Sequence, residues 1–162
     1  MMEQVAENFL FNFICPFLGT VAFSILFNVP RRFYFSCGMV GAMGWVMYCI
    51  TVGFTSTAVA SFFGSLVVVL LSRILTVRKK CPITIFLISG IFPLVPGAGV
   101  YYTAYYLVMN QLAEAAHRGL GAVKVAFAIV LGIVLIVSIP REFFQPRYWK
   151  KRWKLRRRFK RA

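Results

Sequence analysis

The sequence predicts an all-α, polytopic membrane protein: five transmembrane helices in residues 1–140, followed by a basic tail in residues 141–162. Of the 162 residues, 60% are hydrophobic and 14% are charged, a composition typical of chains buried in lipid. Apolar stretches that are long enough to cross about 30 Å of hydrocarbon recur along the chain. The net charge is +15, but eleven of the nineteen Lys and Arg lie between Arg141 and Arg161. The charge therefore belongs to a tail rather than to a nucleic-acid-binding domain.

The first apolar segment, Phe9–Phe27, is interpreted as a true transmembrane helix. A removable signal peptide begins with Lys or Arg and ends at a small-x-small cleavage site. The first eight residues instead contain Glu3 and Glu7, and no such site follows the apolar segment. We therefore expect this segment to remain in the protein. The distribution of Lys and Arg over the spans, given below, predicts that the N-terminus lies outside the cell.

Three further segments have the length of complete spans: Phe33–Phe54, Ala58–Leu75 and Leu120–Ile139. Each contains small residues at helical spacing, a pattern that lets the backbones of neighbouring helices approach closely. The residues concerned are Gly38, Gly41, Ala42, Ala60, Ser61, Gly64, Ser65, Ala128 and Gly132. The pattern fits packing within this chain as well as packing against another subunit.

The segment Ile83–Leu112 is predicted to cross once, as a fourth span broken at Pro93–Gly99. The pieces on either side of the break are about 13 residues each, too short for two separate crossings. With a single crossing, seventeen of the nineteen Lys and Arg fall on one side, leaving Arg118 and Lys124 on the other. Because positively charged loops stay in the cytoplasm, this asymmetry predicts five spans and a cytoplasmic C-terminus in a cell or inner membrane.

The break itself is the predicted substrate site. Pro93 and Pro96 remove two backbone donors, and Gly97 and Gly99 permit close backbone approach. Non-helical backbone persists at membrane depth only where it is packed in protein or lines a wet cavity. Broken helices hold the substrate in many secondary transporters, with free N–H groups at one half and free carbonyls at the other. The alternative is a proline kink that serves only packing.

Four tyrosines follow the break directly. Tyr101 and Tyr105 are spaced i, i+4, as are Tyr102 and Tyr106, so each pair shares one face of a helix. One pair can offer hydroxyl groups to a cavity while the other packs or lies in the membrane interface. We expect Tyr101 and Tyr105 to be the pair that faces the cavity.

With these residues in view, the chain resembles the small half of the threonine/serine exporter family. The similarity lies in "FNVPRR", "GWVMY", "SFFGSLVVVLLSR" and "GIFPLVPGAGVYYTAYYL", in that order, and spans about residues 10 to 139. It implies export of threonine and serine, or of a dicarboxylate such as succinate, and a larger partner subunit that carries the first membrane half. It also implies substrate contacts at four motif residues, Pro93, Pro96, Gly97 and Tyr101.

Candidates for energy coupling are few. Proton-driven export usually requires a titratable group in the membrane, yet the acidic residues lie near the ends of the predicted spans. Coupling is therefore assigned to the partner, or to Glu114 or His117, the latter expected in the loop after the fourth span. Arg73 lies near the cytoplasmic surface, where it either anchors the topology or attracts anionic substrate to the entrance.

Catalytic and cofactor functions are not predicted. No convergent Ser/His/Asp set, paired carboxylates or metal-ligand spacing occurs in the apolar region, so we expect no enzyme, metal or cofactor. The four isolated cysteines are interpreted as plain thiols. A non-transporting assembly subunit and a passive channel remain the alternatives to an exporter.

The tail from Arg141 mixes cations with aromatic residues. Wound as a helix, it aligns Tyr148, Leu155 and Phe159 on one face. This pattern predicts an amphipathic helix on anionic lipids rather than a nucleic-acid-binding segment, because the tail follows directly on a span.

The number of spans bears on assembly. Five spans are few for a complete transporter, which favours a hetero- or homo-oligomer.

Overall fold

The computed structural model describes residues 9–139, and this part of the chain consists of helices joined by short turns, which confirms the all-α prediction. The predicted C-terminal helix lies outside the described residues. The elements are α2 (Phe9–Leu26), η1 (Arg31–Phe33), α3 (Tyr34–Val52), α4 (Thr57–Lys79), α5 (Thr84–Ile91), η2 (Phe92–Leu94), α6 (Gly97–Val108) and α7 (Leu112–Ser138).

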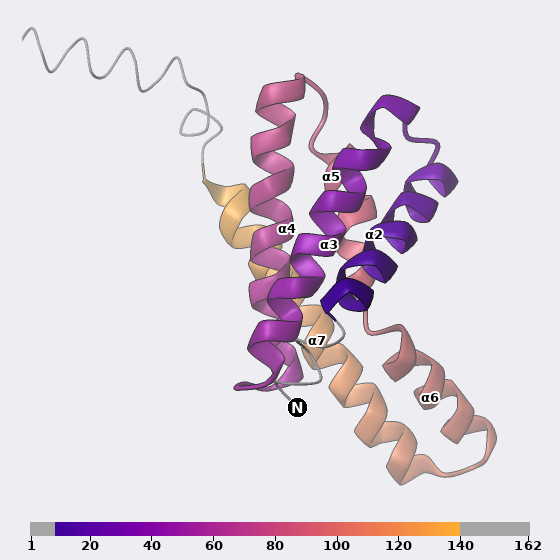
Figure 1. The fold of residues 1–162 in the computed structure, drawn as a ribbon. Coiled ribbons are helices and arrows are strands. Elements are labelled where there is room, and N and C mark those ends of the chain that lie inside the picture. Colours follow the sequence, from indigo (N-terminus) through magenta and orange to yellow (C-terminus); the bar gives the residue numbers. More distant parts are fainter. Residues whose placement is uncertain (1–8, 140–162) are drawn as a thin grey trace, which may run out of the picture.

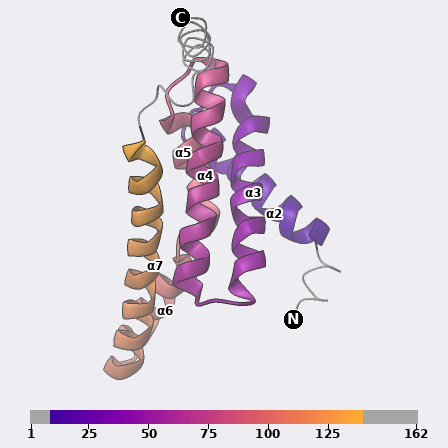
Figure 2. The same ribbon diagram turned by 90° about the vertical axis from the view of Figure 1, so that its left-hand side faces the viewer.

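Helix α3 lies at the centre of the bundle, between α2 and α4, while α7 packs on the other side of α4 (Figures 1 and 2). Helices α5 and η2 pack against α3 and α4. Helix α6 packs against α7, and together they form a hairpin that extends past the turn joining α3 to α4 (Figures 1 and 2). The fold is thus a bundle with a projecting hairpin.

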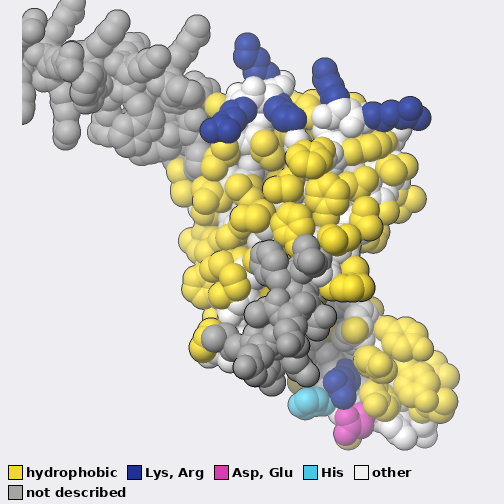
Figure 3. Space-filling view, viewed as in Figure 1, with side chains coloured by type: hydrophobic (Ala, Val, Ile, Leu, Met, Phe, Trp, Pro, Cys, Tyr) yellow, Lys and Arg dark blue, Asp and Glu magenta, His cyan; other side chains and the backbone are white. Residues whose placement is uncertain are grey.

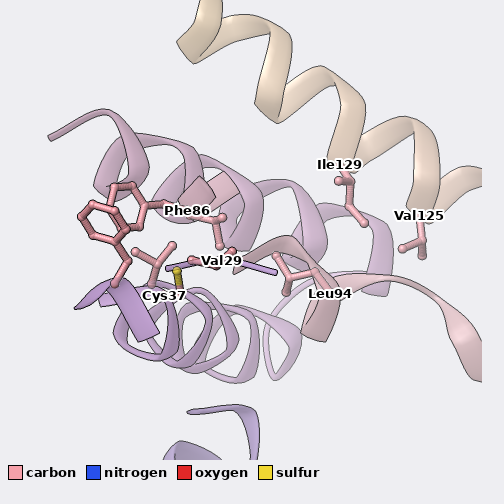
Figure 4. Packing of buried hydrophobic residues seen from close by; sticks show 9 residues of the cluster. Val29, Cys37, Phe86, Leu94, Val125 and Ile129 are labelled. Atoms are coloured by element: carbon pink, nitrogen blue, oxygen red, sulfur yellow. The ribbon is translucent and has the colours of Figure 1, made fainter. Parts of the chain in front are cut away.

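The core of the bundle contains few large side chains. Phe86, Val29 and Cys37 lie toward one end of the cluster, and Leu94, Val125 and Ile129 toward the other (Figure 4). Between the helices, glycines allow very close contact: Gly38 meets the ring of Phe17, Gly41 meets Thr20, and Gly132 meets Ser65. The small-residue faces predicted from the sequence therefore pack within the chain.

Helix ends follow the turn chemistry of the sequence. Asn28, Lys80 and Asn110 have φ values of 54°, 51° and 57°, and each lies just after a helix, where the left-handed conformation ends it. Ser56 precedes α4 and accepts a bond from the N–H of Val59 at 3.5 Å. These turns reverse the chain and make successive helices antiparallel.

Most of the Lys and Arg side chains seen in Figure 3 lie at one end of the molecule. Lys and Arg gather where α2 meets α3 and where α4 meets α5; the exposed residues there are Arg31, Arg32, Arg78, Lys79 and Lys80. The histidine and the described acidic residue lie at the other end, near the turn between α6 and α7. This is the separation that the sequence predicts for a membrane protein.

Three described helices are long and apolar enough to cross a membrane, and the bent pair of Thr84–Leu94 and Gly97–Val108 makes up to four. In α2, the apolar stretch Phe11–Leu26 is shorter than these three helices. The start of the last helix differs from the prediction: α7 begins at Leu112 rather than Leu120. His117, expected in a loop, is therefore helical, because the alanines before the apolar segment favour a helix even though polar residues stand between them.

Candidate functional site

The break predicted at Pro93–Gly99 is present between α5 and α6. Helix α5 gives way to the short helix η2, Val95 is extended (φ −62°, ψ 131°), and α6 begins at Gly97 after Pro96. The two halves are bent by 53°. Pro93 stands in the first turn of η2, where its missing N–H is tolerated, and Pro96 cannot continue the helix.

Among residues 9–139, the turn provides no partner for two backbone donors. The N–H of Gly97 bonds to the carbonyl of Val95 at 2.7 Å, and that of Val100 to the carbonyl of Pro96 at 3.1 Å. The N–H groups of Ala98 and Gly99 have no backbone partner outside the helix, and no side chain caps α6. The start of α6 therefore presents free donors and the positive end of the helix dipole.

An open groove with a volume of about 420 Å³ adjoins the other side of the break. Helix α2 forms one wall, Trp45 of α3 contributes a second, and Phe92 and Pro93 of the break contribute the third. Its lining residues are Phe11, Asn12, Cys15, Pro16, Gly19, Phe23, Trp45, Phe92 and Pro93. The rings of Phe23 and Phe92 stack with centroids 3.8 Å apart, so α2 is held directly against the break.

Of the predicted substrate residues, only Pro93 lines this groove. A Cβ atom added at Gly97 would meet nothing within 4 Å, so the backbone there borders open space. A Cβ at Gly99 would lie 3.1 Å from the Cβ of Ala122, so Gly99 serves the contact between α6 and α7. Pro93 thus lines the groove, Pro96 and Gly97 form the turn, and Gly99 packs inside the hairpin.

The structure does not bring Tyr101 and Tyr105 to the groove. Both are exposed on α6, and their rings contact only the neighbouring tyrosines among the described aromatic groups. The face of α6 that meets α7 carries Thr103, whose Cγ2 would lie 3.2 Å from a Cβ at Gly119. Small residues occupy this interface because they allow the two backbones to approach closely.

Arg73 lies inside the protein rather than at a surface entrance, with 7% of its side chain exposed. Its Nη1 donates to the carbonyl of Ile139, and its Nη2 donates to the carbonyl of Val137 at 2.6 Å. These are carbonyls at the C-terminal end of α7, which have no partner within the helix. The guanidinium group therefore caps α7 and joins it to α4.

Glu114 and His117 are exposed in the first two turns of α7, at the end of the projecting hairpin. Glu114 stands in the first turn, where a negative charge is favourable to the helix dipole. The ring of Tyr102 lies 5.8 Å from the guanidinium carbon of Arg118, which ties α6 to the same end of α7. Neither of the two titratable groups lines the groove.

The cationic end of the bundle has its own contacts. Lys79 donates to Ser36 Oγ at 2.8 Å and lies 5.7 Å from the ring centroid of Phe33. Cys81 follows in the turn before α5, where burial raises the pKa of its thiol despite the opposing effect of Arg32 and Lys79. Among residues 9–139, no group of three His, Cys, Asp or Glu could hold a metal ion.

Sequence reasoning missed the contribution of the first helix to this site. Asn12 and Pro16 are spaced i, i+4 in α2, and both line the groove. A proline within an apolar span, four residues after an amide, is the signal that could have marked them. The sequence alone does not show that α2 lies beside η2.

Comparison with known proteins is consistent with this architecture. The sequence profile of the Threonine/Serine exporter, ThrE, family matches residues 12–139. No curated protein and no solved structure matches the chain. The match covers the break and all of the groove lining except Phe11, and it indicates a multi-pass membrane protein with an exporter-type transport role. The chain therefore belongs to the threonine/serine exporter family.

Proposed function

We propose that this chain is the membrane subunit of a two-component secondary exporter of threonine and serine, or of small organic acids such as succinate. One observation carries the proposal: the bent fourth span has unpaired N–H groups at the start of α6 and an open groove beside Pro93. Non-helical backbone within a span requires polar partners. A substrate with a carboxylate can provide them, as in other broken-helix transporters.

We further propose five spans, in which α2 and the residues before it supply the fifth. With the cationic end of the bundle in the cytoplasm, the N-terminus lies outside the cell and α7 ends inside. The basic tail from Arg141 then lies beside the anionic inner leaflet of the cell membrane, where it binds lipid.

The partner is proposed to be a larger membrane subunit with the first half of the exporter. Only 17% of the apolar window of α7 is buried, against 39% for α3 and 44% for α4. No residue of α6 is buried. Since the small-residue faces of the bundle are used within the chain, we assign the exposed α6–α7 hairpin to the partner.

Coupling to protons is assigned to the partner or to Glu114 and His117. Both residues are exposed at the end of the molecule opposite the cationic cluster, which is the outer mouth in this orientation. Collapse of the proton gradient should then stop efflux. Efflux that continues unchanged would remove this part of the proposal.

The direct test is efflux of labelled threonine, serine and succinate from cells or vesicles that contain this chain, with and without its partner. We expect concentrative, saturable efflux that requires both chains. Equal efflux without either chain would refute the proposal, and conductance without saturation would instead indicate a passive channel.

A substitution separates a transporter from an assembly subunit. Gly97→Leu places a side chain in the open space at the break, and Gly53→Leu places the same side chain in the exposed turn between α3 and α4, where an added Cβ would lie 3.9 Å from its nearest atom, the carbonyl oxygen of Ile50. Both variants should insert and bind the partner, but only Gly97→Leu should lose flux. Loss of assembly in Gly97→Leu alone would favour the scaffold function.

A further inference from the structure

The groove beside the break has an unusual lining for a site that meets a charged metabolite. Four of its nine lining residues are aromatic, namely Phe11, Phe23, Trp45 and Phe92, and none carries a formal charge. Asn12 supplies its amide group. A ligand in the groove is therefore recognised by ring faces and by neutral hydrogen-bonding groups, not by an ion pair.

Pro16 adds a second oxygen acceptor at the same place. Proline has no N–H, so the carbonyl of Asn12, four residues earlier in α2, lacks its usual helical donor. Both residues line the groove, and Gly19, one turn further along, leaves room because it has no side chain. Asn12 thus offers the groove a backbone oxygen as well as a side-chain oxygen.

The hydroxyl group of Thr20 does not donate to either oxygen of Asn12. Thr20 Oγ1 donates to the carbonyl of Pro16 at 2.7 Å, one turn beyond Asn12. No bond to the side chain of Asn12 is present among the described residues. The two oxygens therefore remain available to a donor that enters the groove.

The aromatic rings favour a cation at that position. The face of an aromatic ring is electron-rich and attracts ammonium groups, most strongly for tryptophan. Trp45 is held in place by stacking on Tyr48, with centroids 5.1 Å apart, and Phe92 is held by stacking on Phe23. A carboxylate would be repelled by the same oxygens and ring faces, although the groove would offer it the amide N–H groups of Asn12 as donors.

We propose that Asn12, Pro16 and Trp45 form a subsite for a primary ammonium group. This inference rests on the proposed function for its substrate, and it assigns the ammonium end of a small amino acid to the groove. The carboxylate is then bound outside the groove. A substrate that has carboxylates alone does not use this subsite.

Binding to the full chain in lipid nanodiscs tests the proposal without any measurement of flux. Trp149→Phe and Trp153→Phe leave Trp45 as the one tryptophan, whose fluorescence reports on the groove. The ligands are threonine, threoninol, which lacks the carboxylate, and 3-hydroxybutyrate, which lacks the amine. We expect threonine and threoninol to shift the emission at similar concentrations, and 3-hydroxybutyrate to need at least about tenfold more.

Equally tight binding of 3-hydroxybutyrate would overturn the proposal. So would a Trp45 signal that no amine alters, the result expected if a lipid chain fills the groove. Efflux that fails while threoninol still binds would refute the exporter function alone. Efflux that persists while the carboxylate analogue binds best would refute the ammonium subsite alone.

Variants locate the subsite. Pro16→Ala supplies the missing N–H and should weaken threoninol binding about fivefold to tenfold, as should Asn12→Leu. Asn12→Asp adds a negative charge and should tighten it, which a merely structural role of Asn12 would not do. Pro82→Ala, an exposed proline outside the groove, is the matched control and should leave binding unchanged. Weaker threoninol binding in Asn12→Asp would contradict the assignment.

Discussion

The contact between α4 and α7 gives the sharpest test of the packing. Gly132 of α7 faces Ser65 of α4, and a Cβ atom at position 132 would overlap Ser65 Oγ and lie 3.1 Å from the carbonyl oxygen of Phe62. The Ser65 hydroxyl can move only by giving up its 2.8 Å bond to that same carbonyl. The backbone of Phe62 cannot move independently of its helix. We therefore expect Gly132→Ala to separate the two helices.

The size of the effect follows from three contributions. Overpacking costs about 1–3 kcal/mol, and loss of the Ser65 hydrogen bond costs about 1 kcal/mol. The gain in helix propensity from Gly to Ala returns about 1 kcal/mol. The net destabilisation is therefore about 1–3 kcal/mol.

Gly121→Ala on the same helix is the matched control, since a Cβ there meets nothing within 4 Å. It should be neutral or stabilising by up to about 1 kcal/mol. The free energy of unfolding is measured for both variants by reversible SDS titration in mixed micelles, followed by circular dichroism. Adding Ser65→Ala to Gly132→Ala should recover more than half of the loss. If Gly132→Ala and Gly121→Ala agree within about 0.5 kcal/mol, the close contact of α4 with α7 is refuted.

Three other measurements address the remaining features. Arg73→Gln should release the end of α7, because it removes charged hydrogen bonds that contribute about 1.5–3 kcal/mol each. A spin label at position 138 should then become more mobile. An unchanged spectrum would contradict the capping of α7 by Arg73. Cys81 should react with maleimide more slowly than a free thiol at neutral pH and faster as the pH rises, because its raised pKa leaves less thiolate; the opposite order would contradict the effect of burial. Cys15, exposed at the groove, should react with a water-soluble maleimide and be protected by threonine, and a thiol that never reacts would indicate a dry groove.

The sequence was sufficient to predict the helices and the break but not the partners of each helix face. The prolines and glycines of Pro93–Gly99 act locally, so their effect on the chain can be predicted without tertiary information. The cations at the helix turns likewise mark one end of the molecule. The start of α7 was misplaced because hydropathy does not register that residues 112–119 are good helix formers.

The candidate site was harder to predict because it depends on contacts between distant segments. Two tyrosine pairs on α6 have equal spacing, and only the fit of Gly99 and Thr103 against α7 decides which face points outward. The groove requires α2 to lie against η2, a contact between segments about 70 residues apart. No local pattern in α2 reveals that neighbour.

The bend between α5 and α6 has a consequence for how the protein enters the bilayer. At about 1.5 Å per residue, the twelve residues of α6 extend about 18 Å, and the eight residues of α5 extend about 12 Å. Neither half reaches across about 30 Å of hydrocarbon. Neither half is therefore a complete crossing alone, and only the two halves together have the length of a span. We expect α5 to be stably inserted only after α6 has been synthesised.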